Sequence, residues 1–237
     1  MEVKLLRYTP DAIQLVAEMA RSTRQNDFGD IVSQEYVSIM VQQAGYTDEQ
    51  RTAVANAPTD EDFIRTLIKM KHYGVLEHVV FTFHFSEISR CLTHQLVRHR
   101  IASYLQMSSR HVRPEQYNYI IPLTITQYQP ALEEFMERLD DAYHAYNRLV
   151  DDMHIPVEDA RYLLPPAFWT HVSMTMNMRS IRHLLELRMD KHAQWEIRAL
   201  AFKVFGIVDK IYPVMVEDLR DKYVGRKPKV YRGNTKQ

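Results

Sequence analysis

Residues 79–85 constrain the fold more than any other stretch of the chain, because large apolar side chains recur there at every second position. One face of this segment carries only Val79, Phe81, Phe83 and Phe85. Such a period of two is typical of a β-strand that covers a core. Residues 3–8 and 168–176 are also predicted strands. Long helical stretches separate the three without a regular βαβ order, so we expect an α+β fold. It would be a single domain with a small, mainly antiparallel sheet flanked by long helices.

Helical periodicity accounts for most of the remaining chain. The predicted helices cover residues 10–22, 34–44, 48–55, 60–73, a stretch from about 88 to the arginine-rich segment below, 132–149, 156–162, 179–189 and 193–219. Residues 22–30 and 110–122 are interpreted as loops, the second with a short strand. Without repeats or domain linkers, residues 1–219 are predicted to form one domain. Residues 220–237 are a basic, polar tail and a candidate for disorder.

The composition argues against several classes of protein. The 237 residues include 30 basic and 30 acidic side chains, and this zero net charge gives no general electrostatic reason to bind nucleic acid. A single cysteine, Cys91, rules out an intrachain disulfide framework and fits a reducing compartment. The N-terminus lacks the apolar region of a signal peptide, and no apolar run approaches a membrane span. We therefore expect a soluble, cytoplasmic protein.

Phosphate binding in this chain must depend on side chains. There are six glycines, and neither G-x-G-x-x-G nor G-x-x-x-x-G-K-[ST] occurs. Arginine is the natural replacement, because its planar fork of donors fits phosphate.

The segment from Arg98 to Arg110 supplies such arginines in the pattern R-H-R-x2-S-x4-S-x-R. Its guanidinium and hydroxyl groups suit an anionic or planar ligand. Gln95 precedes Arg98 by three residues, so on one helix both side chains would project from the same face. The alternative is a solvated basic helix end, since arginines there complement the helix dipole without a ligand.

This segment resembles the signature of the flavin-dependent thymidylate synthases, and the resemblance extends through most of the chain. Further matching blocks occur in the family's order at residues 77–84, 161–165, 177–180 and 187–196. The resemblance implies an α+β homotetramer with active sites where subunits meet. It also implies FAD as cofactor, with NADPH and methylenetetrahydrofolate as co-substrates, in the conversion of dUMP to dTMP.

Carried over by position, the resemblance assigns a set of residues to the nucleotide. These dUMP contacts are Gln95, Arg98, Gln106, Ser108, Ser109, Arg110, Arg161 and Arg188. It implies that Arg161 and Arg188 reach the nucleotide from a neighbouring subunit. Arg188 and Ser108 are the candidate catalytic residues, with Ser108 as a ligand rather than a nucleophile, because no base or Gly-x-Ser-x-Gly elbow accompanies it.

A second set of positions corresponds to the family's flavin contacts. These residues are His72, Glu77, Arg98, His99, Arg100, Ile101, Asn177, Arg179, His183 and Leu187. Three of them, Arg179, His183 and Leu187, are spaced four residues apart, so a helix would present them on one face.

The chain departs from the family pattern at several positions. Many members have Asn-Glu where this chain has Leu105-Gln106, so a carboxylate near the uracil ring is replaced by an amide. His183 stands where asparagine is common, and His111 stands where a tyrosine is common. These changes affect individual contacts rather than the reaction class.

Other functions have weaker sequence support. Cys91 is predicted on the apolar side of its helix, where a buried thiol is inert. The eleven histidines form no H-x-x-x-H or H-E-x-x-H motif, so no metal site is expected. Two rival hypotheses remain: a nucleotide-binding module without turnover, and a nucleic-acid binder that uses Arg98, Arg100, Arg110 and Arg113.

Overall fold

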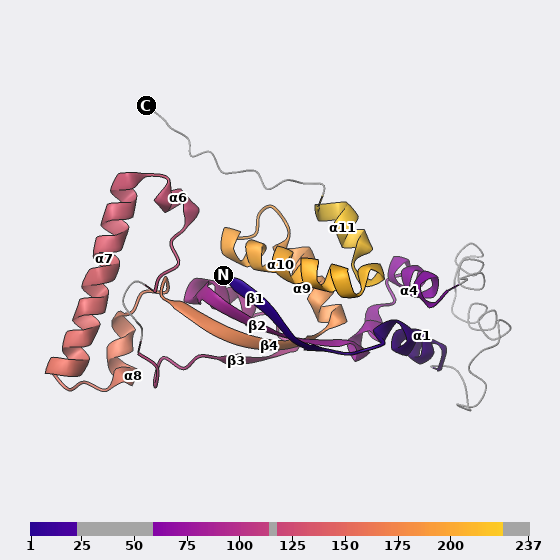
Figure 1. The fold of residues 1–237 in the computed structure, drawn as a ribbon, viewed down its shortest axis with the longest axis horizontal. Coiled ribbons are helices and arrows are strands. Elements are labelled where there is room, and N and C mark those ends of the chain that lie inside the picture. The colour runs from indigo at the N-terminus through magenta and orange to yellow at the C-terminus, as the bar shows by residue number, and fades with distance from the viewer. Residues whose placement is uncertain (23–58, 114–117, 225–237) are drawn as a thin grey trace.

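Four strands form one antiparallel sheet at the centre of the computed structural model, which describes residues 1–22, 59–113 and 118–224 (Figure 1). The strands are β1 (Glu2–Tyr8), β2 (Val80–Ser89), β3 (Ala102–Gln106) and β4 (Trp169–Asn177). Their order in the sheet is β1-β2-β4-β3, and all three pairings are antiparallel. The predicted α+β class and the small antiparallel sheet are confirmed.

One face of the sheet is the base of the main hydrophobic core. The alternating residues of the two central strands point into it: Phe81, Phe83, Phe85, Val172, Met174 and Met176. Helices α5 (Arg90–Leu96), α9 (Met178–Arg188) and α10 (Trp195–Ile211) bury their apolar residues in the same core. In Figure 1, α9 and α10 lie above the strands.

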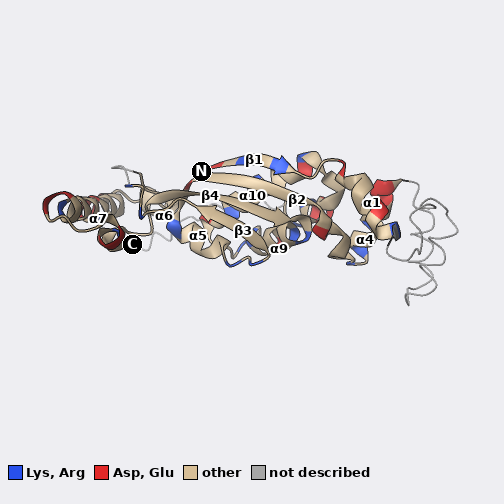
Figure 2. Ribbon diagram, turned by 90° about the horizontal axis from the view of Figure 1, so that it is seen from below, with Lys and Arg blue, Asp and Glu red and all other residues tan. Residues whose placement is uncertain are grey.

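The opposite face of the sheet is polar. Thr82 and Thr175 place their hydroxyl oxygens 3.0 Å apart, and His84 Nδ1 lies 3.0 Å from the Ser173 hydroxyl. In the view from below in Figure 2, the strands lie in front of α10. Cross-strand pairs thus satisfy polar groups on this face.

The remaining elements extend from the two ends of the sheet (Figure 1). At one end are α1 (Ala12–Ser22), α4 (Asp60–Lys69) and the 3₁₀ turn η1 (Tyr73–His78). At the other end residues 118–168 form an arm, which comprises α6 (Leu123–Thr126), α7 (Gln129–Asn147), η2 (Arg148–Asp152), α8 (Val157–Ala160) and η3 (Arg161–Leu163). After α10, the last elements of the described residues are η4 (Pro213–Met215) and α11 (Glu217–Tyr223). No helix within the described ranges is both long and apolar enough to cross a membrane.

Several predicted boundaries are wrong. The predicted helix over residues 60–73 ends at Lys69, and Lys71 has φ of 61° before η1 begins. The helix predicted over 193–219 breaks at Pro213, which has no backbone N–H to continue it. Its last part, α11, continues into the expected tail as far as Tyr223, which is buried in the core. The helices expected at 34–44 and 48–55 lie outside the described residues.

Two other differences affect the functional region. Residues 102–106 form strand β3, which was not predicted. The helix expected from about Ile88 begins at Arg90, because β2 continues through Ser89. The buried face of α5 is formed by Leu92, Thr93 and Leu96, whereas Cys91 is exposed, so the expectation that Cys91 lies on the buried face is wrong.

A buried carboxylate fixes the start of α5. The Glu196 side chain is 2% exposed, and it accepts hydrogen bonds from the Ser89 backbone N–H at 2.8 Å and the Ser89 hydroxyl at 2.5 Å. The Ser89 hydroxyl oxygen in turn accepts the Leu92 N–H at 3.0 Å. Glu196 and Ser89 together satisfy backbone N–H groups at the first turn, which would otherwise have no partner.

We therefore expect Glu196→Ala to destabilise the protein, because two donors of Ser89 would remain buried without an acceptor. The expected loss of unfolding free energy is about 2–4 kcal/mol. Urea denaturation followed by circular dichroism measures it. Glu133→Ala, at an exposed position of α7, serves as the control. Equal midpoints for the two variants would contradict the role of Glu196.

Candidate active site

The larger of two pockets lies between α9 and the turn that follows α5, and we name it the α9 pocket. It has a volume of about 670 Å³. Its lining residues come from η1, the turn, the end of β4 and α9: Tyr73, Glu77, Arg98, His99, Arg100, Ile101, Asn177, Arg179, Ser180, Arg182, His183, Glu186, Leu187 and Arg188. The pocket therefore joins segments that are far apart in the sequence.

Asn177 sets the direction of α9. Its side-chain oxygen accepts the Ser180 N–H at 2.9 Å and caps the helix at the point where β4 ends. Along the helix that follows, Arg179, His183 and Leu187 all line the pocket. Their predicted common face is confirmed.

The turn after α5 differs from its predicted form. The helix ends at Leu96 with Val97 as its C-cap, so Gln95 and Arg98 do not share a helical face as expected. The Tyr104 hydroxyl lies 2.8 Å from the Leu96 carbonyl oxygen and 2.9 Å from that of His99. This residue of β3 therefore holds the turn closed, and burial raises the pKa of its hydroxyl to about 12.

At the base of the turn, His99 and Arg188 form the best-defined polar contact of the pocket. Arg188 Nε donates to His99 Nε2 at 3.0 Å, so the neutral imidazole carries its proton on Nδ1. Burial, the Arg188 charge and His183 together lower the pKa of His99 to about 4. Arg188 Nη1 also donates to the Gln95 side-chain oxygen at 3.5 Å. Arg188 is thus oriented by two neutral acceptors and keeps an uncompensated positive charge.

The α9 pocket suits a large anionic ligand with planar parts. Arg98 and Arg100 make no side-chain hydrogen bond or ion pair with any other described residue, whereas Arg179 pairs with Glu77 at 2.5 Å. Exposed apolar surface lies beside them, since Ile101 is 70% and Leu187 50% exposed. Unpaired guanidinium groups bind phosphate oxygens, and apolar surface packs against flat rings.

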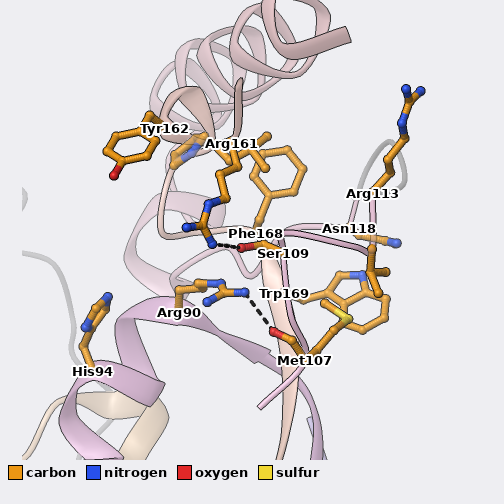
Figure 3. Close-up of a pocket in the computed structure, with 13 residues that line it drawn as sticks. Arg90, His94, Met107, Ser109, Arg113, Asn118, Arg161, Tyr162, Phe168 and Trp169 are labelled. Atoms are coloured by element: carbon orange, nitrogen blue, oxygen red, sulfur yellow. Dashed lines mark hydrogen bonds between the residues drawn. The ribbon is translucent and has the colours of Figure 1, made fainter. Parts of the chain in front are cut away.

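A second pocket of about 530 Å³ lies where the arm meets the sheet, and we name it the η3 pocket (Figure 3). It is lined by Arg90, His94, Met107, Ser109, Val112, Arg113, Asn118, Arg161, Tyr162, Leu164, Pro165, Phe168 and Trp169. Arg161 Nη1 donates to the Ser109 hydroxyl at 3.1 Å, and Arg90 Nη2 donates to the Met107 carbonyl oxygen at 3.2 Å. The arm contributes Arg161, and the sheet side contributes Arg90 and Ser109.

The residues expected to contact flavin lie together. All of them except His72 line the α9 pocket; His72 precedes η1 and stays a prediction.

The residues expected to contact the nucleotide divide into two groups. Arg98 and Arg188 line the α9 pocket, and Gln95 touches Arg188. Ser109 and Arg161 line the η3 pocket instead. Arg188 lies beside Gln95, and Arg161 lies beside Ser109. The expectation that Arg161 and Arg188 reach the nucleotide of a neighbouring subunit stays a prediction.

The other residues expected to contact the nucleotide form hydrogen bonds or ion pairs within the chain. Arg110 forms an ion pair with Glu158 at 2.6 Å, and the Ser108 hydroxyl oxygen accepts the Arg110 N–H at 3.3 Å. Gln106 donates to the Thr93 hydroxyl at 3.2 Å. None of the three lines either pocket in this chain.

The length of β3 separates the two groups. Ile101 lines one pocket and Met107 the other, and the extended chain between them spans about 20 Å. No residue lines both pockets. Within one chain the residues expected to contact the nucleotide therefore line two separate pockets.

The sequence interpretation missed several lining residues. Arg90 and His94 are one helical turn apart on α5 and both line the η3 pocket, and this spacing was a usable signal. Tyr73 and Arg182 line the α9 pocket. The Arg182 side chain is 3% exposed and pairs with Asp218 at 2.6 Å, so it joins α9 to α11. Within the described part of the chain no group of three or more His, Cys, Asp or Glu side chains is arranged to hold a metal ion.

Comparisons with known proteins agree with this arrangement. A family model described as thymidylate synthase complementing protein matches residues 4–214. The chain is 36% identical over 229 residues to a protein of Sulfurisphaera tokodaii named flavin-dependent thymidylate synthase, an alignment that covers 95% of this chain and 78% of the relative. Proteins with the same name from Saccharolobus solfataricus (38% identity; 90% of this chain, 74% of the relative) and Geobacter sulfurreducens (36%; 92% and 86%) are similar to it.

The family match covers η1, the turn after α5, the end of β4 and α9, which line the α9 pocket, together with the segments that line the η3 pocket. The relatives align over nearly the whole chain at more than a third identity. This chain therefore belongs to the flavin-dependent thymidylate synthase family.

Proposed function

We propose that this chain methylates dUMP reductively to dTMP, with FAD as cofactor, methylenetetrahydrofolate as carbon donor and NADPH as reductant. The observation that carries the proposal is the α9 pocket, where Arg98, Arg100, Asn177, Arg179 and Leu187 come together from separate sequence blocks. Family membership supplies the substrates, since its members are named for a flavin-dependent thymidylate synthesis.

The residues of the α9 pocket fit FAD. Arg98 and Arg100 are cations without a partner among the described residues, and they would hold the pyrophosphate. Ile101 and Leu187 offer apolar surface for the flat ring system. Bound FAD supplies the redox-active ring through which a hydride passes from NADPH to the substrate.

Arg188 is the residue best placed to act on the uracil ring. Its guanidinium is held in place by His99 and Gln95, neither of which neutralises its charge. A fixed, uncompensated cation stabilises negative charge that develops on a uracil oxygen. Gln95 positions Arg188, and its side-chain amide would hydrogen-bond with the uracil ring. No residue in this arrangement has to act as a covalent nucleophile.

Each complete site is proposed to need two copies of the chain. One copy contributes Gln95, Arg98 and Arg188 from its α9 pocket, and the other contributes Ser109 and Arg161 from its η3 pocket. The division of these residues between two pockets of one chain supports this arrangement. A closed homotetramer would form such sites repeatedly. Ser108, Arg110 and Gln106 would lie beside the phosphate and ring once the copies meet.

The proposed location is the cytoplasm. The support is the cysteine usage: Cys91 is the one cysteine in the sequence, and its side chain is exposed and unbridged, which fits a reducing compartment.

The reaction is tested directly with purified full-length protein. We expect a yellow protein whose flavin absorbance bleaches with NADPH, and release of tritium from [5-³H]dUMP when methylenetetrahydrofolate is present. Arg188→Ala should slow tritium release about 100-fold or more, because a charge that stabilises the transition state is lost. A colourless protein that does not take up FAD would refute the proposal. Nucleotide binding without tritium release would favour a binding module instead.

Mixed oligomers test the shared site. Arg161→Ala and Arg188→Ala protomers should each be inactive alone, and random mixing should restore about one quarter of the sites, because half of the contributions at each pocket are intact. Arg98→Ala mixed with Arg188→Ala is the matched control, since both changes affect the same pocket and no mixed site is complete. Equal recovery in the two mixtures would contradict the two-copy arrangement.

A pH dependence of stability follows from His99. Its pKa in the folded protein, about 4, lies below that of an unfolded histidine, about 6.5, so protonation favours unfolding. The contribution of neutral His99 to the free energy of unfolding is complete above about pH 6.5 and is lost as the pH falls towards 4. Between pH 7 and pH 5 the wild type should lose about 2 kcal/mol more than His99→Gln, which keeps an acceptor for Arg188.

Urea denaturation of both proteins at the two pH values measures this difference. His144→Gln is the control, because His144 is exposed on α7 and its removal should leave the pH dependence unchanged. If His99→Gln retained the full wild-type pH dependence, His99 would not be held neutral in the folded protein.

A further inference from the structure

His183 lies in the middle of the pocket-facing side of α9, one turn after Arg179 and one turn before Leu187. Its side chain is exposed and makes no hydrogen bond or ion pair with another described residue. Its ring meets that of His99 edge to face, with the two ring centroids 6.3 Å apart. Both ring nitrogens of His183 are therefore available to a ligand in the α9 pocket.

His99 lies close by but differs from His183 in its hydrogen bonding. The His99 side chain is 9% exposed, and its Nε2 already accepts a hydrogen bond from Arg188 Nε at 3.0 Å. Burial, the Arg188 charge and His183 lower the pKa of His99 to about 4, so His99 is neutral near pH 7. Of the two imidazoles among the described residues that line the pocket, His183 is the one free to gain a proton when a ligand binds.

Some of the charged groups in the α9 pocket balance one another. Arg179 pairs with Glu77 at 2.5 Å, and Arg182 pairs with Asp218 at 2.6 Å. The Arg182 guanidinium carbon also lies 5.1 Å from the centroid of the Tyr73 ring. These contacts join η1, α9 and α11 and leave no net charge for a ligand.

The remaining charged groups around His183 do not balance. Arg98, Arg100 and Arg188 have no carboxylate partner among the described residues, and Glu186 is the one further carboxylate in the described lining. The pocket thus has an excess of positive charge, which attracts an anionic ligand. An anion bound there adds negative charge, and nearby negative charge favours the protonated form of an imidazole.

We propose that His183 binds FAD as a protonated imidazole, so that this chain takes up a proton at His183 when the cofactor binds. The inference rests on the proposed function for the identity of the ligand as FAD. A protonated imidazole offers two N–H donors and a positive charge to the anionic cofactor. The asparagine that is common at this position in the family offers only a neutral amide. The histidine therefore makes cofactor affinity depend on pH in this chain.

The direction of the pH dependence follows from the proton uptake. When binding takes up a proton, a lower pH favours the complex, so the dissociation constant for FAD falls as the pH falls from 8 to 6. One full proton would change this constant about tenfold per pH unit, and an imidazole that is partly protonated before binding changes it less. From pH 8 to pH 6 the affinity of the wild type should therefore rise about 5- to 10-fold more than that of His183→Asn.

Isothermal titration of the flavin-free, full-length protein with FAD measures the proton uptake directly. Titrations at pH 7 in two buffers of different ionisation enthalpy, Pipes and imidazole, give the number of protons from the difference in observed enthalpy. His183→Asn should lower this number by about half a proton. His183→Lys, whose charge is permanent, should bind FAD without the uptake at this position and without the added pH dependence.

His144→Asn is the matched control, because His144 is exposed on α7 and lines neither pocket. It should keep the proton uptake and the pH dependence of the wild type. Equal proton uptake by wild type and His183→Asn would overturn the proposal. So would an equal loss of FAD affinity in His183→Asn at pH 6 and pH 8, since that is the effect of a distorted pocket rather than of a lost charge.

Tritium release separates this inference from the proposed reaction. If FAD binding took up a proton at His183 but the loaded protein released no tritium from dUMP, the reaction would be refuted and the role of His183 upheld. If the loaded protein released tritium and His183→Asn took up as many protons as the wild type, the role of His183 would be refuted and the reaction upheld. A protein that bound no FAD would refute both.

Discussion

The pairing of β2 with β4 determines where both helices beside the α9 pocket begin. Each strand leads directly into a helix, and its last residue is the helix cap: Ser89 for α5 and Asn177 for α9. The antiparallel register sets Val80 opposite Asn177, so the two helices start at opposite ends of the sheet. Gln95 near the end of α5 and Arg188 at the end of α9 consequently meet. The position of Arg188 thus depends on the pairing of β2 with β4.

The distribution of carboxylates separates arginines that hold the fold from arginines that await a ligand. Ion pairs of Arg21, Arg65 and Arg182 join α1 to α4, α4 to α11 and α9 to α11. Five of the described arginines that lack a carboxylate partner line the two pockets instead: Arg90, Arg98, Arg100, Arg161 and Arg188. Arg90, Arg161 and Arg188 are partly buried. Because an unpaired, partly buried charge costs stability, the placement of these three indicates selection for binding.

Residue spacing along the sequence predicted the parts of the structure that lie on a single helix or strand. The four-residue spacing of Arg179, His183 and Leu187 sufficed to place them on one face of α9, and the alternation of residues 79–85 sufficed to identify β2. The other residues predicted for the α9 pocket came from the resemblance to the family rather than from residue spacing. The resemblance-based residue set and the geometry of the pocket agree, apart from His72.

Features that depend on distant partners were not predictable in the same way. Strand β3 is short and lies at the sheet edge, and its inward residues Ala102, Tyr104 and Gln106 are too mixed in character to show a period of two. Cys91 was misplaced because it borders the buried face of α5, and the width of that face is set by packing against the rest of the core. The division of the nucleotide residues between two pockets follows from β3, so it too required the three-dimensional arrangement.

The η3 pocket depends on the packing of the arm against the main body. Arg161 and Tyr162 belong to the arm, whereas Arg90 and Ser109 belong to the main body, and the arm has a separate small core of Tyr146, Val150 and Ala160. So small a core gives the arm a lower local stability than the sheet. The η3 pocket is complete only while the arm packs against the sheet, because part of its lining comes from the arm. Substitutions in the arm core would therefore tune substrate affinity without contacting the substrate.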